Sequence, residues 1–306
     1  MRILVSGSTG FLGTFLIEKL QREGHTTARL VRPETSRSQT NGGGQGLSVG
    51  WDPVDGKFDA AAAEGFDALV HLAGASIADK RWNASRKNLL RTSRIAATRH
   101  LMGALSKLQL PPRVIVATSA IGYYGDRGDE ILTETSAPGD DFLAGLCRDW
   151  EAETTRGAEF GARVVNLRFG IILAAHGGAL PRMALPFKMG VGGRLGTGRQ
   201  WMSWLTVGEA AGMIEFALGN SGFAGPANAV TPHPVQNTEF TRILAKTLHR
   251  PALFPAPAFA LRLALGEMAD ALLLPSQRVM PSKLEQSGYK FAWPDLTKAL
   301  VEILQK

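Results

Sequence analysis

The residues with the clearest chemical meaning lie close to the amino terminus. The short apolar run Ile3–Ser6, typical of a β-strand, leads directly into Gly7–Gly13 (GSTGFLG), and a helical apolar pattern follows over Phe11–Arg22. Glycine permits a tight turn and lets backbone approach a pyrophosphate without a Cβ in the way. The first turn of the helix then offers unpaired N–H groups to phosphate oxygens. We therefore predict that this turn binds the diphosphate of a dinucleotide.

The residue that follows the second predicted strand indicates which dinucleotide. Ala28–Val31 is followed by Arg32, at a place where an acid would accept hydrogen bonds from the ribose hydroxyls of NAD. A guanidinium can instead bind a 2′-phosphate through paired hydrogen bonds. We expect NADP(H) in preference to NAD(H); the alternative is that Arg32 is an ordinary surface charge.

Other cofactor contacts are expected where strands end at the same edge of a sheet. Small residues in Leu72–Gly74 would let this edge pass close to the adenosine and ribose, whereas His71 lies within a strand pattern and is interpreted as a packed core histidine. The expected cofactor-binding residues are Gly7, Thr9, Gly10, Phe11, Leu12, Gly13, Val31, Arg32, Leu72, Ala73, Gly74, Arg94, Thr118 and Phe169.

Arg94 is included because of its place on the predicted helix Asn83–Lys107. Apolar residues from Leu90 to Leu105 form one stripe along this helix, and Arg94 lies on the same stripe, one turn after Leu90. A charge on a core-facing side is rarely tolerated without a partner. We expect Arg94 either to pair with a carboxylate or to reach a phosphate of the bound cofactor.

The elements that must position these residues alternate between strands and helices over the first 170 residues. Several of the predicted strands are continuously apolar, which is typical of parallel strands covered by helices on both faces. The fold class predicted is therefore α/β, a Rossmann-type doubly wound parallel sheet. The predicted strands are Ile3–Ser6, Ala28–Val31, Leu47–Gly50, Ala68–Leu72, Val114–Thr118 and Arg163–Leu167, and the predicted helices are Phe11–Arg22, Asn83–Lys107 and Leu143–Phe160.

The pattern changes after residue 170, where helical stretches are repeatedly broken by proline. We predict an NADP-binding domain over 1–170 and a smaller, mainly helical substrate-capping part over 171–306, with segments of the latter returning to the first domain. Glu34–Gly46 is predicted to be a surface loop because it lacks an apolar anchor. Met189–Arg199, rich in glycine, could wrap a ligand or serve as a flexible connection.

Composition excludes several other classes of protein. The net charge is +7, but the basic residues are spread along the chain, so we expect no nucleic-acid partner. Charges interrupt Ala256–Pro275, the most apolar stretch, and we expect no membrane partner. Cys147 is the single cysteine and is expected to be buried and inert, and the histidines lack metal-ligand spacing, so no metal is predicted. A cytoplasmic protein with a small-molecule substrate fits best, and a homodimer is one possible assembly.

At this point the chain resembles the extended short-chain dehydrogenase/reductase superfamily, and more closely its atypical epimerase-like branch with a C-terminal domain of unknown function. This resemblance implies a Rossmann-type domain, bound NADP(H) and a capping part where a nucleotide-sugar substrate would sit in better-known relatives. The resemblance does not indicate which reaction the protein catalyses. The matching segments are Gly7–Gly13, Leu72–Ile77, Ala78–Trp82 (ADKRW), Thr92–Arg94, Gly122–Gly125 (GYYG), Arg168–Leu173, Gly190–Gln200, Val235–Phe240 and Gln277–Pro281.

The same resemblance exposes two departures. Active relatives carry a proton-transferring tyrosine and, four residues later, a lysine that lowers its pKa and holds the ribose, whereas Phe142 and Leu146 stand at the corresponding places here. Neither side chain can move a proton or carry a charge. A WIHxxD-like segment is also expected after the glycine-rich stretch, but this chain reads Trp204–Glu209 (WLTVGE), without the histidine.

Other residues near the end of the fifth strand could take part in chemistry. Ser119 could hydrogen-bond a substrate carbonyl, or it could only cap the strand end. Tyr124, or its neighbour Tyr123, could substitute as a general acid, although an unassisted phenol is a poor base at neutral pH. Lys80 could assist a tyrosine or lie in solvent. We expect Ser119 and Tyr124 to be the catalytic pair.

These observations support two functions. The first is an NADP(H)-binding oxidoreductase or epimerase-like protein that transfers hydride to or from a small polar substrate, either linked to a nucleotide or free. The second is a non-catalytic NADP(H)-binding sensor or regulatory protein, which the loss at Phe142 and Leu146 favours. The glycine turn is common to both and does not discriminate between them.

Overall fold

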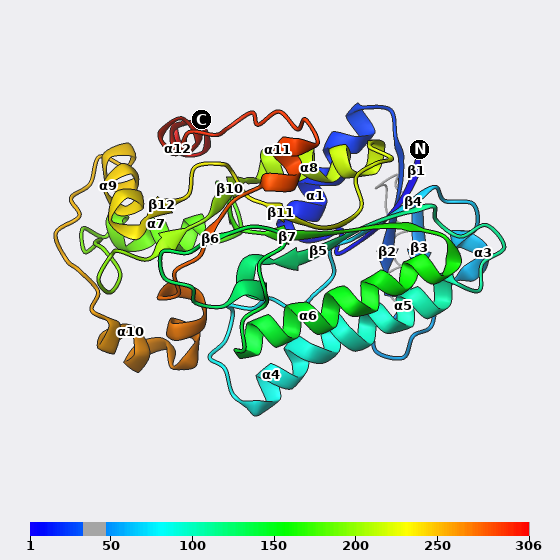
Figure 1. The fold of residues 1–306 in the computed structure, drawn as a ribbon, viewed down its shortest axis with the longest axis horizontal. Coiled ribbons are helices and arrows are strands. Elements are labelled where there is room, and N and C mark those ends of the chain that lie inside the picture. The colour runs from blue at the N-terminus through cyan, green and yellow to red at the C-terminus, as the bar shows by residue number, and fades with distance from the viewer. Residues whose placement is uncertain (33–46, 306) are drawn as a thin grey trace.

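The computed structural model describes residues 1–32 and 47–305. Its centre is a parallel sheet of seven strands in the order β11-β7-β5-β4-β1-β2-β3 (Figure 1). These strands are β1 (Arg2–Ser6), β2 (Thr26–Val31), β3 (Leu47–Gly50), β4 (Ala68–His71), β5 (Val114–Ala120), β7 (Arg163–Phe169) and β11 (Gly225–Ala229). The predicted doubly wound α/β fold is confirmed. The predicted surface loop Glu34–Gly46 lies outside the described residues.

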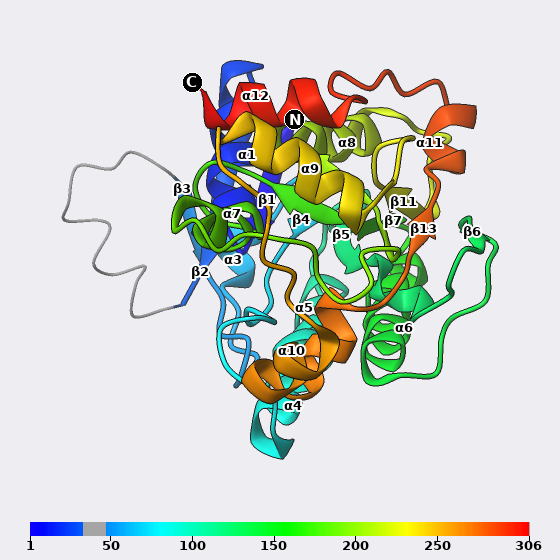
Figure 2. The same cartoon turned by 90° about the vertical axis from the view of Figure 1, so that its left-hand side faces the viewer.

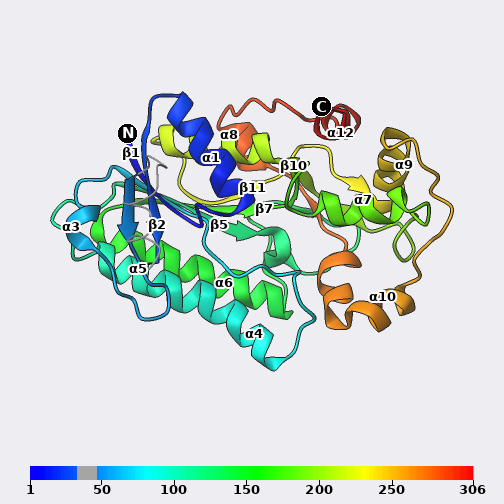
Figure 3. The same ribbon diagram turned by 180° about the vertical axis from the view of Figure 1, so that it is seen from behind.

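Helices cover both faces of this sheet. α1, α8 and α11 lie on one face and α4, α5 and α6 on the other, an arrangement that is also clear from behind (Figure 3). The helices are α1 (Phe11–Arg22), α3 (Ala60–Ala63), α4 (Ala84–Arg91), α5 (Ala97–Leu105), α6 (Phe142–Thr155), α7 (Leu180–Lys188), α8 (Val207–Gly219), α9 (Asn237–Thr247), α10 (Ala258–Leu265), α11 (Ser282–Gln286) and α12 (Leu296–Leu304).

The long predicted helices are present with local changes. The predicted helix Asn83–Lys107 is a continuous helical segment in which a π-helical turn, Thr92–Ala96, joins α4 to α5. The predicted helix Leu143–Phe160 begins one residue earlier, where the Asp141 side chain caps it, and it ends in a 3₁₀ turn over Arg156–Phe160. Sequence periodicity identifies such helices well but does not report a π turn, because the extra residue barely changes the apolar stripe.

The core consists of two apolar layers that follow the alternation of each strand. Ile3 and Val5 of β1 pack toward α1 and α8, whereas Leu4 packs toward α5 on the opposite face. Successive side chains of a strand point to opposite faces, so one strand supplies both layers. A strand buried on both sides is mainly apolar, and this pattern makes β1 and β4 recognisable from sequence.

The second half of the chain contributes to the same sheet. β11 pairs in parallel with β7, and α8 packs on the layer formed by α1. A separate core lies around α7, α9 and α12, which occupy the end of the molecule that faces the viewer in Figure 2. Pairs of short strands lie outside the central sheet: β6 (Ile131–Leu132) with β13 (Arg278–Val279), β8 (Ile171–Leu173) with β10 (Trp204–Thr206), and β9 (Trp201–Met202) with β12 (Val235–Gln236).

Two further features of this half concern the sequence expectations. Within the described ranges no helix combines the length and apolar character that crossing a bilayer requires.

Glu209 anchors the carboxyl-terminal segment to α8, because its buried carboxylate accepts hydrogen bonds from the Tyr289 hydroxyl at 2.6 Å and from the N–H groups of Ala292 and Trp293 at 3.0 and 2.9 Å. Glu209, the acidic residue of the WLTVGE segment, therefore holds the carboxyl-terminal segment against α8.

A buried histidine links the strand ends to the helices behind them. His71 Nδ1 lies 2.7 Å from Ser6 Oγ, and His71 Nε2 lies 2.9 Å from Thr98 Oγ1. Trp150 Nε1 also donates to Thr98 Oγ1, at 2.9 Å. Burial lowers the pKa of His71 to about 4, so the imidazole is neutral at pH 7 and has one hydrogen-bonding partner on each nitrogen. This confirms a packed core histidine.

His71 should make the protein acid-sensitive. The folded chain keeps the imidazole neutral, whereas the unfolded chain binds a proton once the pH falls below about 6.5, so stability decreases from there toward pH 4. The loss between pH 7 and pH 5 should be about 2 kcal/mol, measured by denaturant unfolding at each pH. The variant His71→Gln should lack this pH dependence, and His176→Gln, at an exposed histidine, should retain it. An equal pH dependence in all three proteins would contradict the assignment.

Candidate cofactor-binding site

Two of the three glycines in the first turn are required by close backbone contacts. Gly7 has a φ of +66°, and a Cβ there would lie 2.7 Å from the carbonyl carbon of Leu72 in the loop after β4. A Cβ at Gly13 would lie 2.3 Å from the Gly7 carbonyl oxygen. At Gly10 the nearest atom to a Cβ is 3.3 Å away, so this glycine is constrained much less by the protein itself.

The amino-terminal end of α1 is prepared to accept an anion. Gly10 is its N-cap and offers no side chain to the first turn, so the N–H groups of Phe11, Leu12 and Gly13 lack intrahelical acceptors. Thr9, Gly10 and Phe11 are exposed. Ser8 Oγ is buried without a hydrogen-bonding partner among the described residues. Free donors and a positive dipole end fit a diphosphate.

An arginine that the sequence analysis did not select also contacts this turn. Arg29, inside β2, donates from Nη1 to the Ser8 carbonyl at 2.8 Å and so fixes the turn from the side of the second strand. A cation within an otherwise apolar strand was the signal that could have revealed it. Arg32, one residue beyond β2, is exposed. The backbone N–H groups of Val54 and Asp55 lower the pKa of Asp52, and the positive charge of Arg32 adds to this shift.

The loop after β4 closes the turn from the other side. Ser6 Oγ accepts the backbone N–H groups of Leu72 and Ala73 at 3.1 and 3.3 Å, so the same serine that contacts His71 also holds this loop. Gly74, the next residue, is exposed. The predicted contacts Gly7–Gly13 and Leu72–Gly74 are therefore brought together by the ends of β1 and β4.

The remaining predicted cofactor residues lie in different surroundings. Thr118 Oγ1, near the end of β5, is buried without a partner among the described residues. Val31 and Phe169 are almost completely buried, and Phe169 belongs to the apolar layer beneath α1 and α8. Arg94 donates to the carbonyls of Ala75 at 3.0 Å and Leu90 at 3.4 Å, and no carboxylate among the described residues pairs with it.

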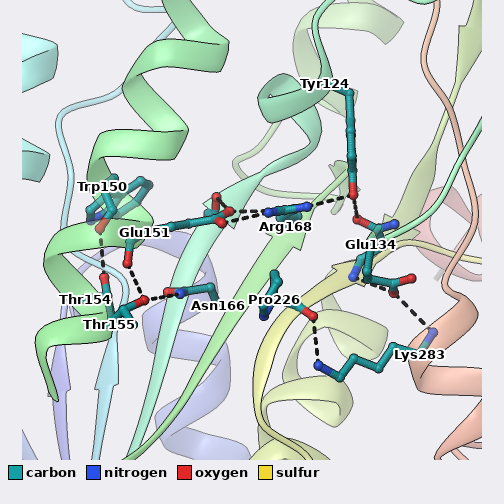
Figure 4. Close-up of polar contacts among 12 residues, drawn as sticks. Tyr124, Glu134, Trp150, Glu151, Thr154, Thr155, Asn166, Arg168, Pro226 and Lys283 are labelled. Atoms are coloured by element: carbon teal, nitrogen blue, oxygen red, sulfur yellow. Dashed lines mark hydrogen bonds and ion pairs between the residues drawn. The ribbon is translucent and has the colours of Figure 1, made fainter. Parts of the chain in front are cut away.

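The expected catalytic pair belongs to a buried polar network (Figure 4). Ser119 donates from Oγ to Glu151 Oε1 at 2.6 Å, and Arg168 binds both oxygens of the same carboxylate at 2.8 Å. Arg168 also donates to the Tyr124 hydroxyl at 3.0 Å, and this hydroxyl donates to Asn228 Oδ1 at 2.6 Å. The network therefore joins β5, α6, β7 and β11.

This placement does not support the expectation that Ser119 and Tyr124 carry out chemistry. Their exposed fractions are 1% and 0%, and both hydroxyls are already bound by the protein. Burial raises the pKa of Tyr124 to about 12, so it is a poor proton donor at neutral pH. Tyr123 packs against the Arg168 guanidinium, whose Cζ lies 3.5 Å from its ring centroid. The GYYG segment shows that two tyrosines follow β5, but the sequence does not show on which side of the strand end each side chain lies.

The start of α6 is apolar at Phe142 and Leu146, the two places where the family resemblance led us to expect a tyrosine and a lysine. Phe142 packs edge-to-face against Trp82, and Leu146 is buried with Leu90 and Leu143. Cys147 is buried nearby, and burial raises the pKa of its thiol to about 12, as expected for an inert cysteine. Among the described residues, no group of three histidine, cysteine or acidic side chains is placed to hold a metal ion.

The ADKRW segment, 78–82, joins the sheet domain to the capping helices. Arg182 of α7 donates to the Ala78 carbonyl at 2.9 Å and to Asp79 Oδ1 at 2.8 Å. Arg81 donates to the carbonyl of Leu263 in α10 at 3.4 Å. Lys80 is exposed between these anchored residues, at a point where the two halves meet. This segment therefore connects the loop after β4 to α7 and α10.

Comparisons with known proteins agree with this geometry. The model of the NAD dependent epimerase/dehydratase family matches residues 3–228. A second model, described as a domain of unknown function (DUF1731), matches residues 256–303. The second match covers α10, β13, α11 and most of α12.

Relatives cover nearly the whole chain. Epimerase family protein YfhF of Bacillus subtilis is 39% identical over 305 residues, which are 99% of this chain and 98% of that protein. The crystal structure of human epimerase family protein SDR39U1 (isoform2) with NADPH is 33% identical, with a TM-score of 0.89 and full coverage of both chains. A nucleoside-diphosphate sugar epimerase from Corynebacterium glutamicum is 34% identical, with a TM-score of 0.79, and covers 99% of this chain and 58% of that one.

The family match, the full-length relatives and the glycine turn at the end of β1 lead to one conclusion. The chain belongs to the NAD dependent epimerase/dehydratase family and carries a C-terminal DUF1731 domain.

Proposed function

We propose that this protein binds NADP(H) and catalyses hydride transfer with a small polar, nucleotide-linked substrate. The observation that carries the proposal is the open amino-terminal end of α1, framed by Gly7–Gly13 and Leu72–Gly74, with Arg32 one strand away. The human relative whose structure is known with NADPH supports the choice of cofactor. Arg32, directly after β2, also supports NADP(H) as the cofactor, because a guanidinium can bind a 2′-phosphate through paired hydrogen bonds.

The cofactor, when bound, supplies the hydride chemistry, and the protein supplies binding and orientation. In this proposal the N–H groups of Phe11–Gly13 hold the diphosphate and Arg32 holds the 2′-phosphate. Leu72–Gly74 lines the ribose, and Val31, Thr118 and Phe169 support the strand ends around it. The cap held by 78–82 would shield the reacting carbon from water.

A non-catalytic sensor or regulatory protein is the second candidate. It is favoured by Phe142 and Leu146, which leave the start of α6 without an ionisable pair. The burial of Ser119 and Tyr124 adds to this argument, because neither hydroxyl is free to exchange a proton with a substrate. Cofactor binding is common to both candidates, so turnover must separate them. A cytoplasmic location, a homodimer and the lack of nucleic-acid and membrane partners stay predictions.

The oxidoreductase proposal predicts oxidation of NADPH. The purified chain should consume NADPH, followed by its absorbance at 340 nm, with at least one compound from a panel of carbonyl compounds and nucleotide sugars. Thermal unfolding with and without NADPH supplies the control, because binding to the folded state raises the melting temperature. A rise in melting temperature without turnover across the panel would favour the sensor, and no rise would reject both candidates.

The assignment of NADP(H) predicts a selective effect of charge reversal. Arg32→Glu should weaken NADPH binding by at least about tenfold, since a hydrogen bond to a charged group contributes roughly 1.5–3 kcal/mol. NADH, which lacks the 2′-phosphate, should be affected by less than about threefold, as measured by titration calorimetry. Arg113 is an exposed arginine directly before β5, at the end of the sheet where the strands begin. Arg113→Glu is the matched control and should leave both affinities unchanged. Equal losses for both dinucleotides would contradict the assignment.

A further inference from the structure

A groove lies beside the carboxyl-terminal half of α8, and we refer to it as the α8 groove. Its volume is about 560 Å³, which is within the range of small-molecule sites in proteins. Met1, His25 and Gly288–Lys290 line it together with residues of α8, and none of the expected cofactor contacts does. α8 and Tyr289 pack on the same apolar layer as α1 (Figure 1).

The length of α1 separates this groove from the cofactor site. The glycine turn precedes α1, whereas Lys19, in its last turn, contacts Glu215 of the groove lining. A helix of 12 residues, such as α1, is about 18 Å long. A small ligand in the α8 groove therefore does not reach the cofactor turn.

Two aromatic rings line the groove and are fixed in position. Phe216 and Tyr289 pack edge-to-face with their ring centroids 5.3 Å apart. The Tyr289 hydroxyl donates to Glu209 Oε1 at 2.6 Å, and a Cβ at Gly212 would lie 2.8 Å from the hydroxyl oxygen, so the absence of a side chain lets the phenol lie against α8. Both rings are half-buried, which leaves part of their surface for a ligand.

Negative charge is in excess at one side of the groove. Glu215 Oε2 lies 2.9 Å from Lys19 Nζ, and Lys19 also pairs with Glu23. Two carboxylates thus share one ammonium group. Burial raises the pKa of Glu215, and the neighbouring carboxyl of Glu23 adds to this shift, as expected where two acids lie close together.

The positive groups of the lining are less well placed to bind an anion. The amino nitrogen of Met1 lies 3.2 Å from His25 Nδ1, so it already has a partner. Lys290 is exposed and has no ion-pair partner among the residues that the structure describes, so its long side chain can extend into solvent. Glu215, in contrast, is held at the groove by Lys19.

This lining matches a ligand that combines a positive charge with an apolar body. A carboxylate accepts strong hydrogen bonds from an ammonium group. Aromatic rings such as Phe216 and Tyr289 attract a cation and also contact an apolar body. An anion of the same size would be repelled by Glu215 and Glu23.

We propose that the α8 groove is a binding site for an organic ammonium ion with an aromatic or apolar body. The ammonium group donates hydrogen bonds to Glu215, and the body lies against Phe216 and Tyr289. This inference goes beyond the proposed function and does not rest on it, because the groove contains none of the expected cofactor contacts.

Three probes of similar size test the sign of the charge. They are 2-phenylethylamine, 3-phenylpropionate and 2-phenylethanol, which share a ring and a short chain but are positive, negative and neutral at pH 7. Titration calorimetry on the full chain should show that 2-phenylethylamine binds at least about tenfold more tightly than either of the others, since it alone forms a charged hydrogen bond with Glu215.

Variants of the lining should change this affinity in opposite directions. Glu215→Gln should weaken binding of 2-phenylethylamine by at least about threefold, and Lys290→Met should strengthen it by about twofold, because it removes a like charge. Glu18→Gln, at an exposed acid of α1, and Lys298→Met, at an exposed lysine of α12, are the matched controls and should leave the affinity unchanged. Loss of stability alone would not produce changes of opposite sign.

A further variant fills the groove without removing a charge. Gly219 lines the groove, and a Cβ there would meet no atom within 4 Å, so Gly219→Leu adds a side chain without displacing the protein. It should abolish binding of 2-phenylethylamine. Gly103 in α5 has the same free space but lies outside the groove, so Gly103→Leu is the control and should bind the amine normally. Melting temperatures show whether each variant is folded.

The outcomes separate this inference from the proposed function. Equal affinities for the three probes, tighter binding of the carboxylate, or no binding of any probe would overturn the assignment of the groove. Unchanged amine affinity in Glu215→Gln and Gly219→Leu would overturn it as well. NADPH binding, titrated on the same wild-type preparation, tests the proposed function alone, so a protein that binds the amine but not NADPH would retain the groove and lose that function.

Discussion

The close approach of the first turn to the loop after β4 is the constraint on which the site depends. A Cβ at Gly7 would lie 2.7 Å from backbone atoms of Leu72, and Ser6 Oγ accepts two N–H groups from the same loop. His71 fixes that serine from behind through a neutral imidazole. The α1 terminus is therefore held rigidly at the edge of the sheet with its donors exposed, which favours binding of an anion without rearrangement.

Several polar and ionisable groups near this edge face the interior. Glu151 and Arg168 join β7 to α6, and Ser119 and Tyr124 extend the network to β5 and β11. A buried ion pair adds little net stability, because removing both charges from water costs about as much as their attraction returns. Ser119 and Tyr124 therefore connect the end of β5 to α6 and β11, and the start of α6 is packed with Phe142 and Leu146.

The fold could be predicted from sequence because its strongest signals are local. β1, β2, β4, β5 and β7 each contain a mainly apolar, buried run, and α1 matches its predicted bounds, Phe11–Arg22. β11 could not be found in this way, since its sequence, GPANA, has little apolar character and becomes a strand only by pairing with β7. Arg29 was missed for a related reason: its contact with Ser8 joins residues 21 positions apart.

The sequence by itself determined the order of strands and helices and the glycine turn, because both depend on residue type and spacing along the chain. That Phe142 and Leu146 stand in place of a tyrosine and a lysine is what the family resemblance implies. Only the tertiary structure decided which side chains face the cofactor edge and which face the core. Ser119 and Tyr124 follow the same strand as Thr118, yet Glu151 and Asn228 bind their hydroxyls. Those partners come from α6 and β11, so their positions are set by long-range packing rather than by local sequence.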